Sequence, residues 1–134
     1  GEGERQDVRD ALNYLISQSS ARQVLLLGYS FGAAIGCSVV DEFDEIAAFG
    51  AVSYPFSFIP QFRREARSKK PKFLAMGDED DFTTLSRFRE ECEKMPAPKV
   101  CKVYEGVNHF WARRDQKLAQ DVFAWAKLLN FPLN

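Results

Sequence analysis

Residues 23–32 read Gln-Val-Leu-Leu-Leu-Gly-Tyr-Ser-Phe-Gly, and this stretch decides the predicted fold. The four residues from Val24 to Leu27 form a short apolar run that ends at a glycine. Such a run is typical of a strand buried on both faces of a parallel sheet. Small residues follow Ser30 and favour a helix that packs closely against neighbouring backbone, over about residues 30–40. They are Gly32, Ala33, Ala34 and Gly36.

The rest of the chain alternates between helical and strand patterns. Apolar residues recur at helical spacing in three more segments, residues 4–17, 84–95 and 115–129. Either Thr83 or Thr84 can cap the second of these helices. Short apolar runs predict three further strands, residues 46–52, 72–76 and 100–104. The alternation is typical of an α/β fold, and we expect a mostly parallel sheet of about four strands with flanking helices.

The chain has 134 residues, a length that suits one domain over residues 1–134. Its 18 basic and 19 acidic residues give a net charge of −1, so no positive excess points to a nucleic acid or an anionic membrane. No apolar run approaches the ~18 residues that a membrane span requires. The acidic and polar first residues do not resemble a secretory signal. We therefore expect a globular domain with neither nucleic-acid nor membrane partners.

The cysteines and the single histidine argue against a metal site. Cys37, Cys92 and Cys101 contain no Cys-x-x-Cys pair, and His109 is the one histidine in the sequence. We therefore expect no metal. We expect the cysteines to be reduced thiols, mostly buried, which favours a cytoplasmic protein.

The segment Gly28-Tyr29-Ser30-Phe31-Gly32 matches the pattern Gly-x-Ser-x-Gly between a predicted strand and a predicted helix. In this context the turn is so tight that the serine takes a strained backbone conformation and its hydroxyl stands clear of the sheet. We expect Gly28 and Gly32 to prevent collisions with the neighbouring strand and helix. The N–H of Phe31, at the start of the helix, can stabilise an oxyanion.

Two other interpretations of these glycines stay open. They can serve only to bring a helix close to a sheet. Glycines between a strand and a helix can also hold phosphates, but the sequence contains neither Gly-Lys-Ser/Thr nor Gly-x-Gly-x-x-Gly at this place. The phosphate-binding interpretation is therefore the weaker one.

A serine nucleophile needs a base and a group that orients the base. His109 lies just after the strand predicted at 100–104, and the acidic run Gly77–Asp81 follows the strand predicted at 72–76. Both positions are carboxyl ends of strands, where sites in parallel sheets assemble. The chain order Ser30, Asp80, His109 is one known order of a catalytic triad. The alternative is that the histidine is an ordinary loop residue and the acidic run a solvated loop.

On these residues the sequence resembles the α/β-hydrolase superfamily. The matching segments are Gly28–Gly32, Gly77–Asp80 and Asn108–Phe110. The resemblance is nearest to small esterase-like members of the dienelactone-hydrolase branch. It extends over essentially the whole chain, but it covers only the C-terminal half of the superfamily fold.

The resemblance implies a role for each of three residues. Ser30 would be the nucleophile, His109 the general base and acid, and Asp80 the group that orients His109. The Gly-x-x-Asp pattern of the superfamily selects Asp80 rather than Asp78 or Asp81. Chemistry of this kind needs no metal and no organic cofactor.

The strands that precede the serine strand in the superfamily have no counterpart in this sequence. The loop that supplies the second oxyanion donor lies among them, so no residue can be assigned to that role. The strand at 24–27 would keep one unpaired edge, and such an edge invites pairing with another chain. We expect either that the chain is a piece of a longer protein or that self-association or another polypeptide completes the sheet.

These observations predict a serine hydrolase of carboxylesterase or thioesterase type that acts on a small ester, thioester or related acyl compound. Aromatic residues are candidates to line the substrate pocket, although core packing is an alternative role for each; they are Tyr29, Tyr54, Phe56, Phe110 and Trp111. A serine peptidase of the same superfamily is one alternative function. A non-catalytic α/β-hydrolase-like module for protein interaction is another.

Overall fold

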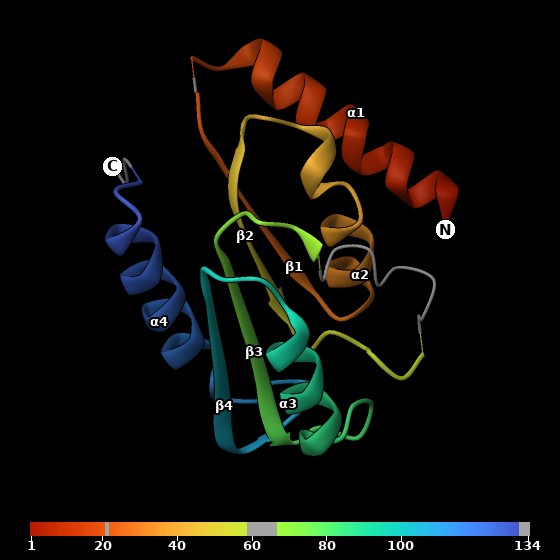
Figure 1. The fold of residues 1–134 in the computed structure, drawn as a ribbon, viewed down its shortest axis with the longest axis vertical. Coiled ribbons are helices and arrows are strands. Elements are labelled where there is room, and N and C mark those ends of the chain that lie inside the picture. The colour runs from red at the N-terminus through yellow and green to blue at the C-terminus, as the bar shows by residue number, and fades with distance from the viewer. Residues whose placement is uncertain (21, 59–66, 132–134) are drawn as a thin grey trace.

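A single four-stranded sheet organises the chain in the computed structural model, which describes residues 1–20, 22–58 and 67–131 (Figure 1). The strand order is β1-β2-β3-β4, and every neighbouring pair is parallel. The strands are β1 Val24–Tyr29, β2 Ile46–Val52, β3 Lys72–Glu79 and β4 Lys99–Asn108. The helices are α1 Glu2–Gln18, α2 Phe31–Cys37, α3 Leu85–Lys94 and α4 Asp115–Leu128, with a short 3-10 helix, η1, at Val40–Glu42. The predicted α/β class with a parallel sheet is confirmed.

Helices cover both faces of the sheet (Figure 1). Neighbouring strand residues point to opposite faces, so Leu74 packs toward α2 and α3 whereas Phe73 packs toward α4. One core contains Phe88 of α3, and the other contains Trp125 of α4. The central strands β2 and β3 are buried along most of their length because both of their faces are covered.

The prediction that β1 is buried on both faces is wrong for this chain. Val24 is buried, but the side chain of Leu27 is 50% exposed and that of Tyr29 is 45% exposed. The cause is the position of β1 at the edge of the sheet, where β2 is its one strand neighbour among the described residues. The expected unpaired edge is therefore present.

Strands β3 and β4 are longer than their apolar runs predicted. Beyond the core the two strands continue as polar segments that pair with each other, and Glu79 lies in register with Asn108. Backbone hydrogen bonds can pair two strands even where their side chains are polar. The apolar pattern of the sequence therefore underestimates the length of such strands. These extensions carry the chain to the two loops that hold Asp80 and His109.

Candidate active site

The backbone at Ser30 makes the sharp turn that the motif predicts. Strand β1 ends at Tyr29, α2 begins at Phe31, and Ser30 between them has φ 53° and ψ −126°. A residue with a side chain rarely takes this conformation, which costs about 1–3 kcal/mol. Hydrogen bonds hold the turn, because the Ser30 N–H donates to the Val52 carbonyl at 2.9 Å and the Ser30 carbonyl accepts from Ala33 N–H at 3.0 Å.

The two glycines of the motif differ in what surrounds them. A Cβ at Gly28 would lie 2.5 Å from the Cα of Ala33 and 2.7 Å from the carbonyl oxygen of Gly32, so only glycine lets α2 approach β1 this closely. A Cβ at Gly32 would meet no described atom within 4 Å. The expected steric need for glycine therefore holds at Gly28 and not at Gly32, because position 32 faces open space.

Matched alanine substitutions should separate these glycines. We expect Gly28→Ala to destabilise the fold by about 3 kcal/mol, because the obstructing atoms are backbone and cannot rotate away. Gly32→Ala should change stability by less than about 1 kcal/mol, and in the favourable direction, because alanine is the better helix former. Urea unfolding of both variants measures the difference. Equal destabilisation by the two substitutions would contradict this account of the turn.

Three polar side chains meet at the carboxyl ends of β1, β3 and β4. The Oγ of Ser30 lies 2.8 Å from Nε2 of His109. On the other side of the ring, Nδ1 of His109 lies 2.9 Å from Oδ2 of Asp80. The side chains of His109 and Asp80 are 5% and 1% exposed, and Ser30 is half-buried. The structure thus brings Ser30, His109 and Asp80 into one continuous line of hydrogen bonds.

Asp80 is fixed by contacts at both carboxylate oxygens. While Oδ2 faces His109, Oδ1 accepts hydrogen bonds from the N–H groups of Phe82 at 2.8 Å and Thr83 at 3.3 Å. The neighbouring acids differ, because Asp78 and Asp81 are exposed. The buried position and the histidine contact distinguish Asp80 within the acidic run.

Gly77, which follows the strand predicted at 72–76, supports this arrangement. A Cβ at Gly77 would lie 1.8 Å from the carbonyl oxygen of Val107. The close approach lets the ends of β3 and β4 converge, and Asp80 and His109 follow directly from those ends. No local pattern signals this contact, because it joins segments about thirty residues apart.

Aromatic rings surround His109. The ring centre of Phe82 lies 4.2 Å from that of the imidazole, and the centres of Tyr29 and Phe110 each lie 5.5 Å away. The Tyr29 hydroxyl also donates a hydrogen bond to the His109 carbonyl at 2.9 Å. Burial, and then the nearby Asp80 carboxylate, raise the pKa of the Tyr29 hydroxyl. These contacts hold the histidine ring in place while Phe110 remains 73% exposed.

The predicted pocket residues fall into two groups. Tyr29, Phe110 and Trp111 line a pocket of about 280 Å³ together with Val52 and Leu118. The structure places the other two candidates in the core between the sheet and α3. They are Tyr54 and Phe56.

Tyr54 and Phe56 stack on each other with ring centres 4.4 Å apart. Phe56 also packs toward Phe88 of α3, at 6.5 Å between ring centres. The carbonyl of Tyr54 accepts a hydrogen bond from the Thr83 hydroxyl at 3.0 Å, close to the loop that carries Asp80. Tyr54 thus supports the site from within the core and does not line the pocket.

Phe31 is the first residue of α2, so its N–H has no acceptor within that helix and lies next to Ser30. No second N–H donor can be assigned from the described residues. Within the described ranges, no cluster of three or more His, Cys, Asp or Glu side chains could hold a metal ion. Nor is any helix in these ranges both long and apolar enough to cross a membrane.

Several solved structures have the same fold as this chain. An α/β serine hydrolase homologue from Coxiella burnetii superposes with a TM-score of 0.78 at 24% identity, over 88% of this chain and 56% of that one. A serine hydrolase without a lid from Xanthomonas campestris gives a TM-score of 0.83 at 17% identity, over 98% and 59%. The esterase domain of a Rhodothermus marinus protein gives 0.78 at 18% identity, over 91% and 68%. The chain therefore has an α/β-hydrolase fold, in part.

The family follows from the sequence itself. The model of the dienelactone hydrolase family matches residues 3–131, and the chain belongs to this family. A relative in Rickettsia prowazekii (strain Madrid E), the uncharacterized protein RP471, is 27% identical over 130 residues. That match covers 91% of this chain and 55% of the relative, so the chain spans about half the length of the relative. The predicted superfamily and the predicted partial fold are confirmed.

Proposed function

We propose that the chain carries the nucleophile, base and orienting acid of a serine hydrolase that acts on an ester, thioester or related acyl compound. One observation carries the proposal: a hydrogen-bonded line from Ser30 Oγ through His109 to Asp80, with Ser30 at a strained strand-to-helix turn. Membership of a hydrolase family supports the same reaction class. The proposal of an acyl compound as substrate is supported by this arrangement of Ser30, His109 and Asp80 and by the nearby pocket of about 280 Å³.

The hydrogen bonds indicate where the protons lie. Asp80 accepts at both oxygens from backbone N–H groups and His109, so the proton of the imidazole sits on Nδ1. The lone pair of Nε2 then faces the Ser30 hydroxyl, which donates to it. In this tautomer His109 is ready to accept the proton of Ser30 as a general base.

The reaction would proceed in two stages. Ser30 Oγ attacks the acyl carbonyl while His109 Nε2 takes its proton, and the buried Asp80 carboxylate stabilises the imidazolium. The Phe31 N–H donates to the developing oxyanion. His109 then gives the proton to the leaving alcohol or thiol, which leaves Ser30 acylated. Water, activated by His109, releases the acid and restores the serine.

Short acyl esters of p-nitrophenol test the proposal. We expect the chain to release p-nitrophenol with saturation in substrate, and His109→Gln to remove this activity while the fold remains. Lys117→Gln is a matched control, because Lys117 lies exposed on α4 and outside the line of hydrogen bonds. Equal rates for the chain and His109→Gln would contradict the proposed role of the histidine.

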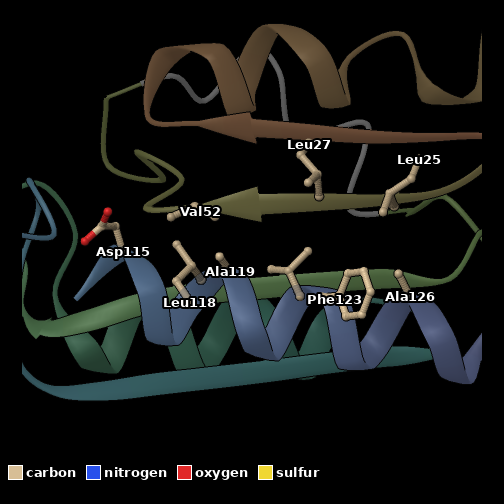
Figure 2. A pocket seen from close by; sticks show the side chains of 9 residues that line it. Leu25, Leu27, Val52, Asp115, Leu118, Ala119, Phe123 and Ala126 are labelled. Carbon is tan, nitrogen blue, oxygen red and sulfur yellow. The ribbon is translucent and has the colours of Figure 1, made fainter. Parts of the chain in front are cut away.

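The edge of β1 is the place where we propose that further polypeptide joins this chain. Leu25 and Leu27 point from β1 toward Leu118 and Phe123 of α4 across an apolar groove of about 400 Å³ (Figure 2). Leu27 is 50% exposed and Phe123 is 53% exposed. The groove is continuous with the unpaired strand edge, and natural proteins seldom leave such an edge uncovered.

The occupant that we propose is the part of the fold present in relatives and absent from this chain. Because the chain spans 55% of the Rickettsia relative, a large segment is available to add a strand to β1 and to fill the groove. That segment would lie beside Ser30, at the end of β1, where it would add a second oxyanion donor to the N–H of Phe31. A chain of 134 residues studied alone would instead associate with itself through this edge.

A charged side chain in the groove should weaken this self-association. At low micromolar concentration we expect the 134-residue chain to sediment as a dimer or larger species, and Leu27→Lys to shift it toward the monomer. Leu128→Lys is the matched control, because Leu128 is 82% exposed on α4 but does not line the groove. A monomeric chain, or equal effects of the two lysines, would contradict the proposed role of this edge.

We propose a reducing compartment, such as the cytoplasm, as the location of the protein. Cys37, Cys92 and Cys101 are all thiols in the structure. Disulfides form and persist mainly in oxidising compartments, so three thiols support this location.

A further inference from the structure

Two cysteine thiols lie next to each other at the edge of the sheet opposite β1. Cys92 is in α3 and Cys101 is in β4, two residues after Lys99, whose Nζ donates a hydrogen bond to the Cys92 carbonyl oxygen at 2.5 Å. Cys101 is in register with Leu74, which belongs to the same core as Cys92, so both thiols are on one face of the sheet. Cys92 is buried, at 6% exposure, whereas Cys101 is exposed.

Two lysines fix the backbone around this thiol pair. Lys99 begins β4, and its Nζ donates to the carbonyl oxygens of Cys92 at 2.5 Å and Met95 at 2.7 Å. The buried Lys72 of β3 donates to the carbonyl of Pro96 at 2.6 Å. These hydrogen bonds join the C-terminal end of α3, and the residues that follow it, to the strands β3 and β4.

The surroundings make the two thiols chemically different. The neighbouring Cys92 thiol, and then the positive charges of Lys99 and Lys72, lower the pKa of the Cys101 thiol. The neighbouring Cys101 thiol, and then burial, raise the pKa of the Cys92 thiol, and the nearby Glu91 carboxylate acts in the same direction. An exposed cysteine with a lowered thiol pKa, next to a second thiol, is the arrangement of cysteines that react reversibly with oxidants.

We propose that Cys92 and Cys101 form a reversible redox pair, in which exposed Cys101 is the site of oxidation by a peroxide and buried Cys92 is the resolving thiol. The Cys101 thiolate attacks one oxygen of the peroxide, the O–O bond breaks, and Cys101 becomes a sulfenic acid while hydroxide leaves and is protonated to water. The Cys92 sulfur then attacks the Cys101 sulfur, loses its proton, and expels a second water as the disulfide forms. The two thiols lose two electrons and two protons, and the peroxide is reduced. A dithiol reductant restores both thiols.

The pair is separate from the proposed hydrolase site. Cys101 lies near the start of β4 and His109 follows its end, so roughly 20 Å of strand separates them. The pair also lies at the edge of the sheet opposite β1, so a polypeptide that joins β1 leaves Cys101 exposed. A test of the redox pair is therefore independent of a test of the proposed hydrolase activity.

Hydrogen peroxide is the probe that tests the pair. The 134-residue chain is treated with peroxide, remaining thiols are alkylated, and peptides are mapped by mass spectrometry with and without reductant. We expect a reducible Cys92–Cys101 linkage, and alkylation of Cys101 in the untreated protein about tenfold faster than of Cys37, which is buried. Cys92→Ser should instead accumulate sulfenic acid on Cys101, trapped by dimedone. Cys37→Ser, the matched control, should still form the linkage.

Three results would overturn the proposal. Oxidation of Cys101 no faster than that of Cys37 would remove Cys101 as the reactive site. Overoxidation of Cys101 without any linkage to Cys92 would remove Cys92 as the resolving thiol. Disulfides between two chains in place of the Cys92–Cys101 linkage would show that exposure alone governs the chemistry. Far-ultraviolet circular dichroism of each variant confirms that the fold is retained.

Discussion

Replacing Ser30 with alanine is expected to lower kcat for acyl-ester hydrolysis by about five orders of magnitude. The substitution removes the one oxygen that lies 2.8 Å from Nε2 of His109, and no other described side chain donates a hydrogen bond to that nitrogen. The measurement is the rate of p-nitrophenol release from a short acyl ester. The alanine variant should keep the fold, since the strained turn is held by backbone hydrogen bonds.

Ser86→Ala provides the control for the nucleophile. Ser86 is exposed on α3, and its hydroxyl contacts only Thr84 among the hydrogen bonds recorded for the described residues. We expect this variant to hydrolyse the ester at the rate of the unmodified chain. More than about a tenth of the original activity in Ser30→Ala would refute the assignment of Ser30.

Replacing Asp80 with asparagine is expected to lower kcat by about four orders of magnitude. The asparagine amide has the same shape, but its NH₂ group would face Nδ1 of His109 and favour the tautomer with the proton on Nε2. In that tautomer the ring can no longer accept the Ser30 proton. The change should therefore appear in kcat more than in KM, because the substrate pocket is not altered.

Asp81→Asn tests whether the effect belongs to Asp80 or to the acidic loop. Asp81 is adjacent in sequence but exposed, so its neutralisation should leave kcat within about twofold of the original. Equal losses for the two asparagine variants would indicate that the negative charge of the loop, and not one oriented carboxylate, assists the reaction.

The strands of this fold were predictable from the sequence where a run of apolar residues forms a strand buried at the centre of the sheet. Strand β2 has the predicted bounds, Ile46–Val52, because the central position buries the whole run. Thr84, one of two predicted caps, accepts the hydrogen bond of Arg87 N–H at the start of α3. The exposure of β1 was not predictable from its own residues, because it depends on which strands lie beside it.

The meeting of Ser30, Asp80 and His109 was also predictable, because each follows a parallel strand and such strands end at one edge of the sheet. The contacts that support this geometry could not be predicted from the sequence. The contact of Gly77 with Val107 joins segments distant in sequence, and no periodicity marks it. The same holds for the neighbouring positions of Cys92 and Cys101, since the spacing of two cysteines does not reveal that a helix and a strand bring them together.

Labelling by a fluorophosphonate tests the roles of Ser30 and His109 together, because this reagent reacts with a serine only when a base activates it. We expect a single covalent adduct on Ser30 of the folded 134-residue chain, mapped by mass spectrometry and absent from His109→Gln. Unfolding in urea should abolish the reaction. An unlabelled folded chain, or an adduct on a different serine, would rule out the proposed roles of Ser30 and His109 and favour a non-catalytic α/β-hydrolase-like module.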